Sequence, residues 1–259
     1  MTNSEDRELA EPGGKLRLFI EAPLGKGVRV EPSAQQAHYL LHVMRARPGD
    51  RVSVFNGRQG QWLAEISEAS RRSCVLTCIR LAAAQGDVPD LWLVFAPIKK
   101  TAADYVAQKA TELGVRVLQP VFTRRTIVHR INQDRMRANA IEAAEQSGRL
   151  TVPEAREGVE LVKLLQSWPA DRRILFCDEG GGSPIAETLA VAATGAWAIL
   201  IGPEGGFDPV ERDLIRANPL AVPVSLGSRI LRADTAALAA LSIWQAIGGD
   251  WRQGGQRSG

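Results

Sequence analysis

Along residues 16–82, apolar positions fall in short runs that alternate with polar positions or stop at turns. Such runs are typical of strands, because successive side chains of a strand point to opposite faces. The predicted strands cover residues 16–21, 27–32, 51–56, 61–67 and 74–81. Residues 57–60 begin and end with glycine and predict a hairpin turn. Short strands at this close spacing predict a small β-barrel over residues 15–85.

One helix interrupts these strands, at residues 33–46. Ser33 can cap its first turn, and its apolar positions recur at helical spacing, at Ala37, Leu40, Leu41 and Met44. After the last strand, residues 83–89 contain Gly, Asp and Pro and are expected to form a linker.

From Asp90 the pattern changes to strands that alternate with helices. The predicted strands are residues 91–97, 115–122, 173–178, 197–202 and 222–227, and helices are expected at 101–113 and 132–149. Gly114 follows the first of these helices, where a left-handed residue often ends a helix. The strands are apolar throughout, which is typical of a parallel sheet covered on both faces. Residues 88–250 therefore predict an α/β domain.

The two ends of the chain are polar or rich in glycine. Residues 1–14 and 251–259 cannot bury apolar surface, so we expect them to be disordered. The longest apolar run, residues 197–201, is too short to cross a bilayer, and the charged N-terminus lacks the apolar core of a signal peptide. These features predict a cytoplasmic protein without a membrane contact.

Cysteine and histidine form no pattern typical of a metal site. Cys74 and Cys78 lie four residues apart in a predicted strand and so share one face, and we expect them to be buried apolar side chains. Cys177 is far away in the sequence, and the three histidines match no ligand spacing. We therefore expect neither a disulfide nor a bound metal.

Positive charge is concentrated in the middle of the chain. The formal net charge is +3, but residues 98–150 alone carry 10 basic and 5 acidic side chains. A concentrated basic surface suits a phosphate backbone, although a solvated face without a partner explains the charge equally well.

Three predicted strands run directly into glycine-containing loops. Residues 202–206 read Gly-Pro-Glu-Gly-Gly and are followed by Asp208, Pro209 and Glu211, which are typical of a helix start. Asp178 precedes three glycines after another strand. Because glycine lets a ligand approach bare backbone, and open α/β sheets bind ligands at the carboxyl ends of strands, these loops predict one pocket at one sheet edge. The alternative for residues 202–206 is a tight turn.

The third loop, residues 227–235, carries Arg229, Arg232 and Asp234 before a helix that is rich in Ala and Leu on nearly every side. Such a helix must be buried, either in the core or against a partner subunit. Taken singly, Asp234 is explained equally well as a helix cap, and Arg232 as a member of a structural ion pair. The chain lacks a P-loop, the usual dinucleotide-binding glycine motif, and the metalloprotease and serine-hydrolase motifs.

Four segments together resemble a known family. QKATELGV (108–115), EAAEQSGR (142–149), LIGPEGGF (200–207) and LGSRILRADTA (226–236) resemble the RsmE family of 16S ribosomal RNA uridine N3-methyltransferases, in the SPOUT superfamily. The resemblance covers residues 16–249. It implies a PUA-like N-terminal barrel that helps to hold RNA, and a C-terminal SPOUT domain with a deep trefoil knot. It also implies S-adenosylmethionine (SAM) as cofactor, small-subunit ribosomal RNA as substrate, and a homodimer.

The resemblance also implies site residues. The residues expected to bind SAM are Asp178, Gly202, Pro203, Glu204, Gly205, Gly206, Leu226, Gly227, Ile230, Leu231, Arg232 and Thr235. Arg232, Arg229 and Asp234 are the expected catalytic residues. The basic side chains expected to hold RNA are Arg17, Arg45, Lys99, Lys100, Arg124, Arg125 and Arg149, the last of which can instead pair with Glu145 one helical turn earlier.

One residue departs from the family pattern. Many relatives have Glu where this chain has Asp234, so the carboxylate is one methylene shorter, which favours a capping or positioning role. Two alternative functions stay open on the sequence: a SPOUT methyltransferase for another RNA position or a ribose 2′-OH, and a non-catalytic RNA-binding factor.

Overall fold

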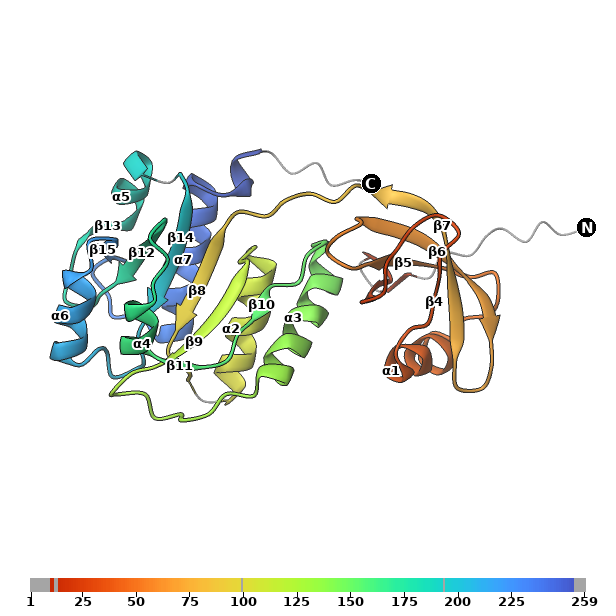
Figure 1. Cartoon of the computed structure of the whole chain (residues 1–259), viewed down its shortest axis with the longest axis horizontal. Coiled ribbons are helices and arrows are strands. Elements are labelled where there is room, and N and C mark those ends of the chain that lie inside the picture. Colours follow the sequence, from red (N-terminus) through yellow and green to blue (C-terminus); the bar gives the residue numbers. More distant parts are fainter. Residues whose placement is uncertain (1–9, 12–13, 99, 193, 254–259) are drawn as a thin grey trace, which may run out of the picture. The chain divides into compact units, whose positions relative to one another are not determined.

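The computed structural model of the chain describes residues 10–11, 14–98, 100–192 and 194–253 (Figure 1). It divides into two compact units. The first contains the described residues up to Asp87 together with Ala144–Val152, and the second contains those of Val88–Ala143 and those from Pro153 to Gln253.

The first unit is built on a five-stranded sheet in the order β3-β5-β6-β7-β4. Strand β3 (Arg17–Phe19) runs parallel to β5 (Arg51–Phe55), while β6 (Gln61–Ala69), β7 (Cys74–Ala83) and β4 (Arg29–Val30) add antiparallel neighbours. The predicted strands are all confirmed. Inward-facing side chains such as Leu18, Val54 and Ile66 form one core, which includes the free thiols of Cys74 and Cys78.

The predicted helix of this unit has two parts. Helix α1 (Ala34–His38) continues as a π-helical turn, η1 (Tyr39–Val43). Ser33 caps α1 as predicted: its hydroxyl accepts from Gln36 N, and the Gln36 side chain accepts from Ser33 N.

Arg17, a predicted RNA ligand, is instead a structural centre of the first unit. Its guanidinium donates to the Gln61 side chain and to the carbonyl oxygens of Ala144, Glu145 and Arg149, at 2.8 to 3.1 Å. Burial lowers the pKa of Arg17 to about 10, although the Glu145 carboxylate opposes this shift. Because the guanidinium is occupied by protein acceptors, the structure does not support a phosphate contact for Arg17.

The second unit is built on a sheet whose strands are all parallel, as predicted. The order is β10-β9-β8-β14-β12-β15-β13, and β11 also pairs with β9. In chain order the strands are β8 (Leu91–Phe95), β9 (Val117–Phe122), β10 (Glu154–Ala155), β11 (Val159–Glu160), β12 (Arg172–Cys177), β13 (Ser183–Pro184), β14 (Ala196–Ile201) and β15 (Ala221–Ser225). The two-residue strands β10, β11 and β13 were not predicted, because segments so short carry no periodicity.

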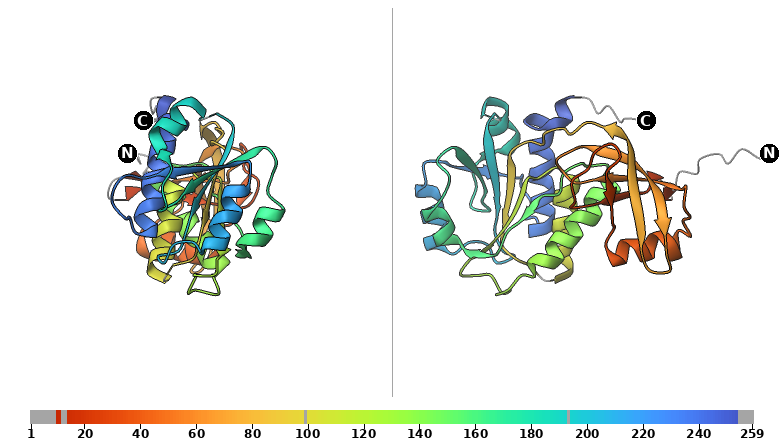
Figure 2. Two further views of the ribbon diagram at one scale, coloured as in Figure 1. Left: turned by 90° about the vertical axis from the view of Figure 1, so that its left-hand side faces the viewer. Right: turned by 45° about the vertical axis from the view of Figure 1, so that its right-hand side comes forward.

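Helices cover both faces of this sheet (Figure 2). On one face, α4 (Leu161–Gln166) and α6 (Pro209–Ala217) contribute Leu161 and Ile215 to a core with alternate residues of the strands. On the other face, α7 (Ala233–Ile247) packs on β14 and contacts α2 (Lys100–Glu112) and α5 (Ile185–Ala192). Helix α3 (Gln133–Ser147) links the two units. Across the described ranges, no helix is long and apolar enough to span a membrane.

Ordered structure extends further toward both ends than predicted. Strands β1 (Ala10–Glu11) and β2 (Gly14–Lys15) pair antiparallel inside the segment expected to be disordered, because backbone pairing needs no apolar side chains. The 3-10 helix η2 (Asp250–Gln253) begins one residue before the expected C-terminal tail. The remaining parts of both predicted tails, residues 1–9, 12–13 and 254–259, lie outside the described residues.

Gln245 holds the end of the second unit together. Its fully buried side chain donates from Nε2 to the Leu113 carbonyl at 2.6 Å and accepts from Asp250 N at 3.1 Å. One amide therefore joins the end of α2, the end of α7 and the start of η2. Gly114 has φ 82° and Gln245 lies against it, so a side chain at position 114 would displace the amide.

We predict that Gln245→Leu lowers the free energy of unfolding by about 2 kcal/mol, because the fully buried amide and both of its backbone hydrogen bonds are lost. Urea denaturation measures this change. Gln166→Leu, at an exposed position on α4, is the matched control and is expected to change stability by less than about 0.5 kcal/mol. Equal stabilities of the two variants would contradict the structural role of Gln245.

Candidate functional site

Three loops meet at one edge of the parallel sheet. Strands β14, β12 and β15 are direct neighbours, and each ends in a glycine-containing loop (Figure 1). Because the strands are parallel, residues 202–208, 178–182 and 226–232 all leave the sheet at the same edge. The structure thus brings together the three segments that the sequence predicts to form one pocket.

The glycines of the loop at 202–208 are required for different reasons. A Cβ at Gly202 would lie 2.6 Å from the Phe207 ring, and Gly206 has φ 67° and would collide with the Glu179 carboxylate. These two glycines are therefore explained by packing within the chain. A Cβ at Gly205 would meet only the Arg125 side chain, at 3.9 Å. Gly205 is thus the glycine of this loop that internal packing does not demand.

The start of α6 fixes the end of this loop. Asp208 caps the helix, Pro209 occupies its first turn, and Glu211 completes the capping box, all as predicted. Glu211 is buried and also accepts from Arg124 N at 2.9 Å. The sequence showed the capping pattern but not this second contact, because the partner lies 87 residues away.

Asp178, predicted to bind the cofactor, is held by charges of the chain itself. Its side chain is 0% exposed; Arg212 Nε lies 3.1 Å from Oδ1, and Arg216 Nη2 lies 2.7 Å from Oδ2. Gly180 N also donates to Oδ1 at 3.0 Å. Asp178 therefore shapes the loop at 178–182 with both carboxylate oxygens engaged. Sequence reasoning missed Arg212 and Arg216, whose spacing of four residues on one helix face was the available signal.

The third loop is the most exposed of the three. Ser225 Oγ accepts from Gly227 N, and Gly227 has φ 109°, so the chain turns sharply after β15. Arg229 and Arg232 are exposed, and Ile230 is 89% exposed. These side chains thus stand on the surface beside the sheet edge.

Asp234 does not cap helix α7, although capping is one explanation for this residue in the sequence. The N-cap residue is Arg232, and Asp234 lies inside the first turn, where Oδ1 accepts from Thr235 N at 2.7 Å and from Thr235 Oγ1 at 3.3 Å. A carboxylate in the first turn is stabilised by the helix dipole. The capping interpretation of Asp234 is therefore wrong, but a positioning role within the first turn fits its contacts.

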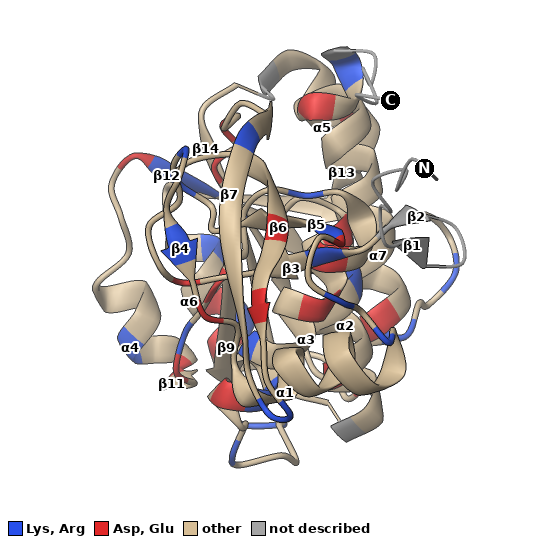
Figure 3. Cartoon of the chain, turned by 90° about the vertical axis from the view of Figure 1, so that its right-hand side faces the viewer, with Lys and Arg blue, Asp and Glu red and all other residues tan. Residues whose placement is uncertain are grey.

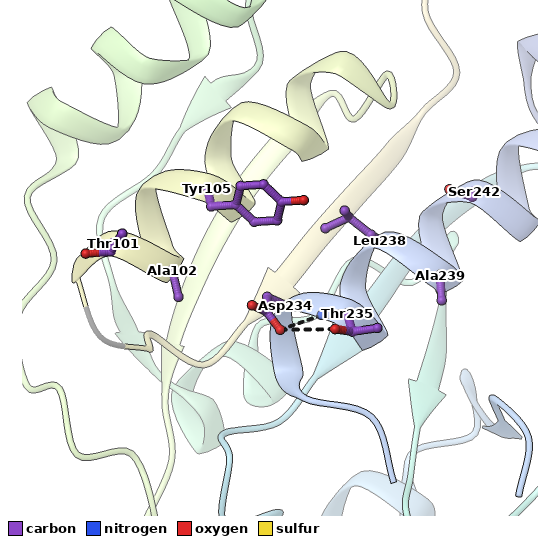
Figure 4. Close-up of a pocket in the computed structure, with 8 residues that line it drawn as sticks. All are labelled: Thr101, Ala102, Tyr105, Asp234, Thr235, Leu238, Ala239 and Ser242. Atoms are coloured by element: carbon purple, nitrogen blue, oxygen red, sulfur yellow. Dashed lines mark hydrogen bonds between the residues drawn. The ribbon is translucent and has the colours of Figure 1, made fainter. Parts of the chain in front are cut away.

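A groove of about 730 Å³ lies between α2 and α7, next to the third loop (Figure 4). Figure 4 shows Tyr105 from α2 and Asp234, Thr235 and Leu238 from α7 around it. Other residues of α7, such as Leu241 and Trp244, are buried, and the helix contacts β14, α2 and α5. The predicted burial of α7 therefore holds for one side of the helix within this chain.

The predicted RNA ligands have different surroundings. Arg124 Nη1 donates to Asp208 Oδ1 at 3.0 Å, and Arg125 Nη1 donates to the Gly205 carbonyl at 2.9 Å. Arg149 Nε donates to Thr151 Oγ1 at 2.8 Å. Arg45 is exposed, with φ 54°. Lys99 lies outside the described residues, and the structure does not describe the side chain of Lys100.

Neither a metal nor a reactive thiol is indicated. The described residues contain no group of three or more His, Cys, Asp or Glu side chains that could hold a metal ion. Cys177 ends β12 beside the three loops, and burial raises the pKa of its thiol to about 12. The thiol is therefore protonated at neutral pH, a form that is a poor nucleophile.

The sequence matches two protein families. Residues 86–245 match an RNA methyltransferase domain, and residues 33–78 match an RNA methyltransferase PUA domain. The ribosomal RNA small subunit methyltransferase E of Synechocystis is 31% identical over 218 residues, which are 82% of this chain and 71% of the relative. The protein of that name from Rickettsia conorii is 28% identical over 90% of this chain and 96% of its own length.

Solved structures show the same fold. A putative methyltransferase from Legionella pneumophila, in complex with SAM, is 28% identical with a TM-score of 0.83, over 91% of this chain and 98% of its own. The ribosomal RNA small subunit methyltransferase E of Neisseria gonorrhoeae, bound to S-adenosyl methionine, is 26% identical with a TM-score of 0.83, over 91% and 99%. The family that the four motifs predict is confirmed, and the chain belongs to the RNA methyltransferases, among the ribosomal RNA small subunit methyltransferases E.

Proposed function

We propose that this protein methylates N3 of a uridine in the decoding region of 16S ribosomal RNA, with SAM as the methyl donor. The observation that carries the proposal is the meeting of three glycine-containing loops at the ends of β14, β12 and β15. Two solved relatives of the same fold hold SAM, and one of them bears the name of a small-subunit ribosomal RNA methyltransferase.

The three loops have the groups that a SAM site needs. Exposed Ile230 and half-buried Leu231 offer apolar surface for an adenine ring, and Gly205 offers open backbone. We assign cofactor contacts to the loop backbones and to the α7 start, at Gly202, Pro203, Glu204, Gly205, Gly206, Leu226, Gly227, Ile230, Leu231, Arg232 and Thr235. Asp178 supports these loops through its ion pairs with Arg212 and Arg216 of α6.

The bound cofactor would supply an electrophilic methyl group on a sulfonium. Uracil N3 becomes nucleophilic when its proton leaves, and the resulting charge spreads onto O2 and O4. The exposed guanidinium of Arg232, at the α7 N-cap, is suited to stabilise that charge, with Arg229 as a second cation. Asp234 Oδ1 is engaged by Thr235, so Oδ2 is the oxygen assigned to accept the N3 proton, directly or through water.

Several finer features of the proposal come from the family resemblance. We propose that residues 88–250 contain the SPOUT trefoil knot and that residues 15–85 form the PUA-like barrel that helps to hold RNA. We also propose a cytoplasmic homodimer in which the exposed side of α7 contributes to the subunit interface. Arg45, Lys99, Lys100 and Arg149 are the remaining candidates for RNA phosphate contacts.

We predict that the purified protein, given SAM and small ribosomal subunits that lack the modification, transfers one methyl group to N3 of a uridine. Mass spectrometry of the digested RNA identifies the methylated nucleoside and its position. A methyl group on a ribose 2′-OH or on another base would refute the N3 assignment while leaving the methyltransferase assignment intact. No SAM binding would favour the non-catalytic RNA-binding factor.

We predict that Arg232→Ala lowers kcat about 100-fold, because a fixed cation no longer stabilises the uracil anion. Turnover is measured with saturating RNA and SAM, so that weaker binding of either does not contribute. Arg252→Ala, at an exposed arginine of η2, is the charge-matched control and is expected to keep wild-type turnover. Near-wild-type kcat for Arg232→Ala would remove Arg232 from the mechanism.

We predict that Gly205→Val weakens SAM binding at least tenfold in calorimetry, because a branched side chain crowds backbone that the cofactor approaches. The melting temperature should stay close to that of the wild type, since a Cβ at this position makes only ordinary contacts. Gly202→Ala is the contrasting variant and should lower the melting temperature, because its Cβ meets the Phe207 ring. Unchanged SAM affinity in Gly205→Val would exclude Gly205 from the cofactor site.

A further inference from the structure

The turn that follows β9 is fixed by its own side chains. Thr123 N donates to Thr126 Oγ1 at 3.0 Å, Thr126 N donates to the Thr123 carbonyl at 3.0 Å, and the two hydroxyls lie 2.9 Å apart. Both threonines are buried. The two residues between them, Arg124 and Arg125, are therefore presented from a defined turn rather than from a freely moving loop.

The start of α6 holds this turn from the other side. The buried Glu211 carboxylate accepts from Arg124 N at 2.9 Å, and Asp208 Oδ1 accepts from Arg124 Nη1 at 3.0 Å. Glu211 also accepts from Asp208 N, at 3.4 Å. As a result, two hydrogen bonds join the turn after β9 to the start of α6, and the third ties Glu211 to Asp208 at the end of the loop at 202–208.

Arg125 extends this contact to the middle of the loop. Its Nη1 donates to the Gly205 carbonyl at 2.9 Å. Its Cβ and Cδ both lie 3.9 Å from the point where a Gly205 side chain would begin, so the alkyl stem lies beside the glycine without filling that space. The charged end holds the carbonyl while the stem runs alongside the loop.

Gly205 needs such a contact more than the other glycines of the loop. Phe207 packs against Gly202, and the Glu179 carboxylate lies against Gly206. Gly206 N also donates to the Pro203 carbonyl at 2.9 Å, which closes the turn around Glu204 and Gly205. The Gly205–Gly206 peptide is therefore held at both ends: its N–H by the Pro203 carbonyl inside the loop, and its carbonyl by Arg125 from outside the loop.

We propose that Arg125 is a positioning residue for SAM: it fixes the Gly205–Gly206 peptide in the orientation that receives the cofactor. This inference rests on the proposed function. It gives Arg125 a different role from the phosphate contact expected from the sequence, because a guanidinium that donates to a backbone carbonyl organises the loop instead of the RNA. Preorganised backbone lowers the ordering cost of binding, so the effect of Arg125 belongs to SAM affinity.

The test compares Arg125→Ala with Arg130→Ala, which removes the same charge from an exposed position five residues further along the chain. We expect Arg125→Ala to raise the Kd for SAM about tenfold in calorimetry without RNA, the usual effect of losing one charged hydrogen bond. Arg130→Ala should keep the wild-type Kd. Arg125→Lys should recover part of the affinity, because an ammonium group can donate to the same carbonyl.

Two further measurements separate positioning from the alternatives. Hydrogen exchange of the Gly206 amide should become faster in Arg125→Ala than in Arg130→Ala even without SAM, since the turn loses its outer support. The salt dependence of RNA binding should be the same in both variants. Unchanged SAM affinity and amide exchange, together with a lower salt slope in Arg125→Ala, would identify a phosphate ligand and overturn the proposal.

The same measurements distinguish failure of the proposed function from failure of the positioning role of Arg125. If the wild-type protein bound no SAM, the methyltransferase assignment would fall, while the amide exchange would still report whether Arg125 fixes the Gly205–Gly206 peptide. If the wild type bound SAM and Arg125→Ala bound it equally well with unchanged exchange, only the positioning role would be wrong.

Discussion

The buried carboxylate of Asp178 is the charge on which the geometry of the site depends. A fully buried carboxylate is unstable unless it is paired and hydrogen-bonded, and here two arginines of α6 and the Gly180 amide satisfy it. The pairing fixes α6 against the end of β12. Because α6 begins directly after the loop at 202–208, the same ion pairs also determine where that loop must end.

From Asp178 and its partners, contacts extend to the loop at 202–208 and to the turn after β9 but, among the described residues, not to the exposed loop at 226–232. Arg212 also approaches the Glu179 carboxylate, which lies against Gly206. Glu211 and Asp208 hold the turn after β9, and Arg125 returns from that turn to the Gly205 carbonyl. The chain thus supports its glycine-rich loop with charged side chains from the ends of β12 and β9 and from α6 with its N-cap. The colouring of charges in Figure 3 shows how widely Lys, Arg, Asp and Glu are distributed over the rest of the chain.

The loop at 202–208 is supported by many contacts, whereas the loop at 226–232 is exposed. This contrast fits their proposed roles, cofactor binding for the first and catalysis on the RNA for the second. A cofactor site benefits from backbone that is already in place, which the contacts around Gly205 provide. The segment with Arg229, Ile230 and Arg232 is exposed in the chain and leads into the start of α7, where Asp234 and Thr235 line the groove between α2 and α7. Alignment of a nucleobase with the methyl group requires contacts from several directions, and in the proposed homodimer this open side is where RNA and the second subunit supply them.

The sequence by itself determined the longer strands and helices, the parallel sheet and the family. Apolar runs, glycine-ended helices and capping residues such as Ser33 and Asp208 act over a few neighbouring positions, so their physical effect is readable from local order. The sequence also placed three glycine-containing loops at strand ends, since parallel strands must end at one edge.

Only the tertiary structure decided which side chains support the loops and which remain exposed. In the sequence, nothing distinguishes Arg17 or Arg125 from an ordinary surface arginine. In the structure, Arg17 donates to backbone carbonyls of the first unit, whereas Arg125 donates to the Gly205 carbonyl. Asp178 meets Arg216 across 38 residues, and Glu211 meets Arg124 across 87. Such partners are selected by the packing of α6 on the sheet, and no local pattern of residues encodes a contact formed over that distance.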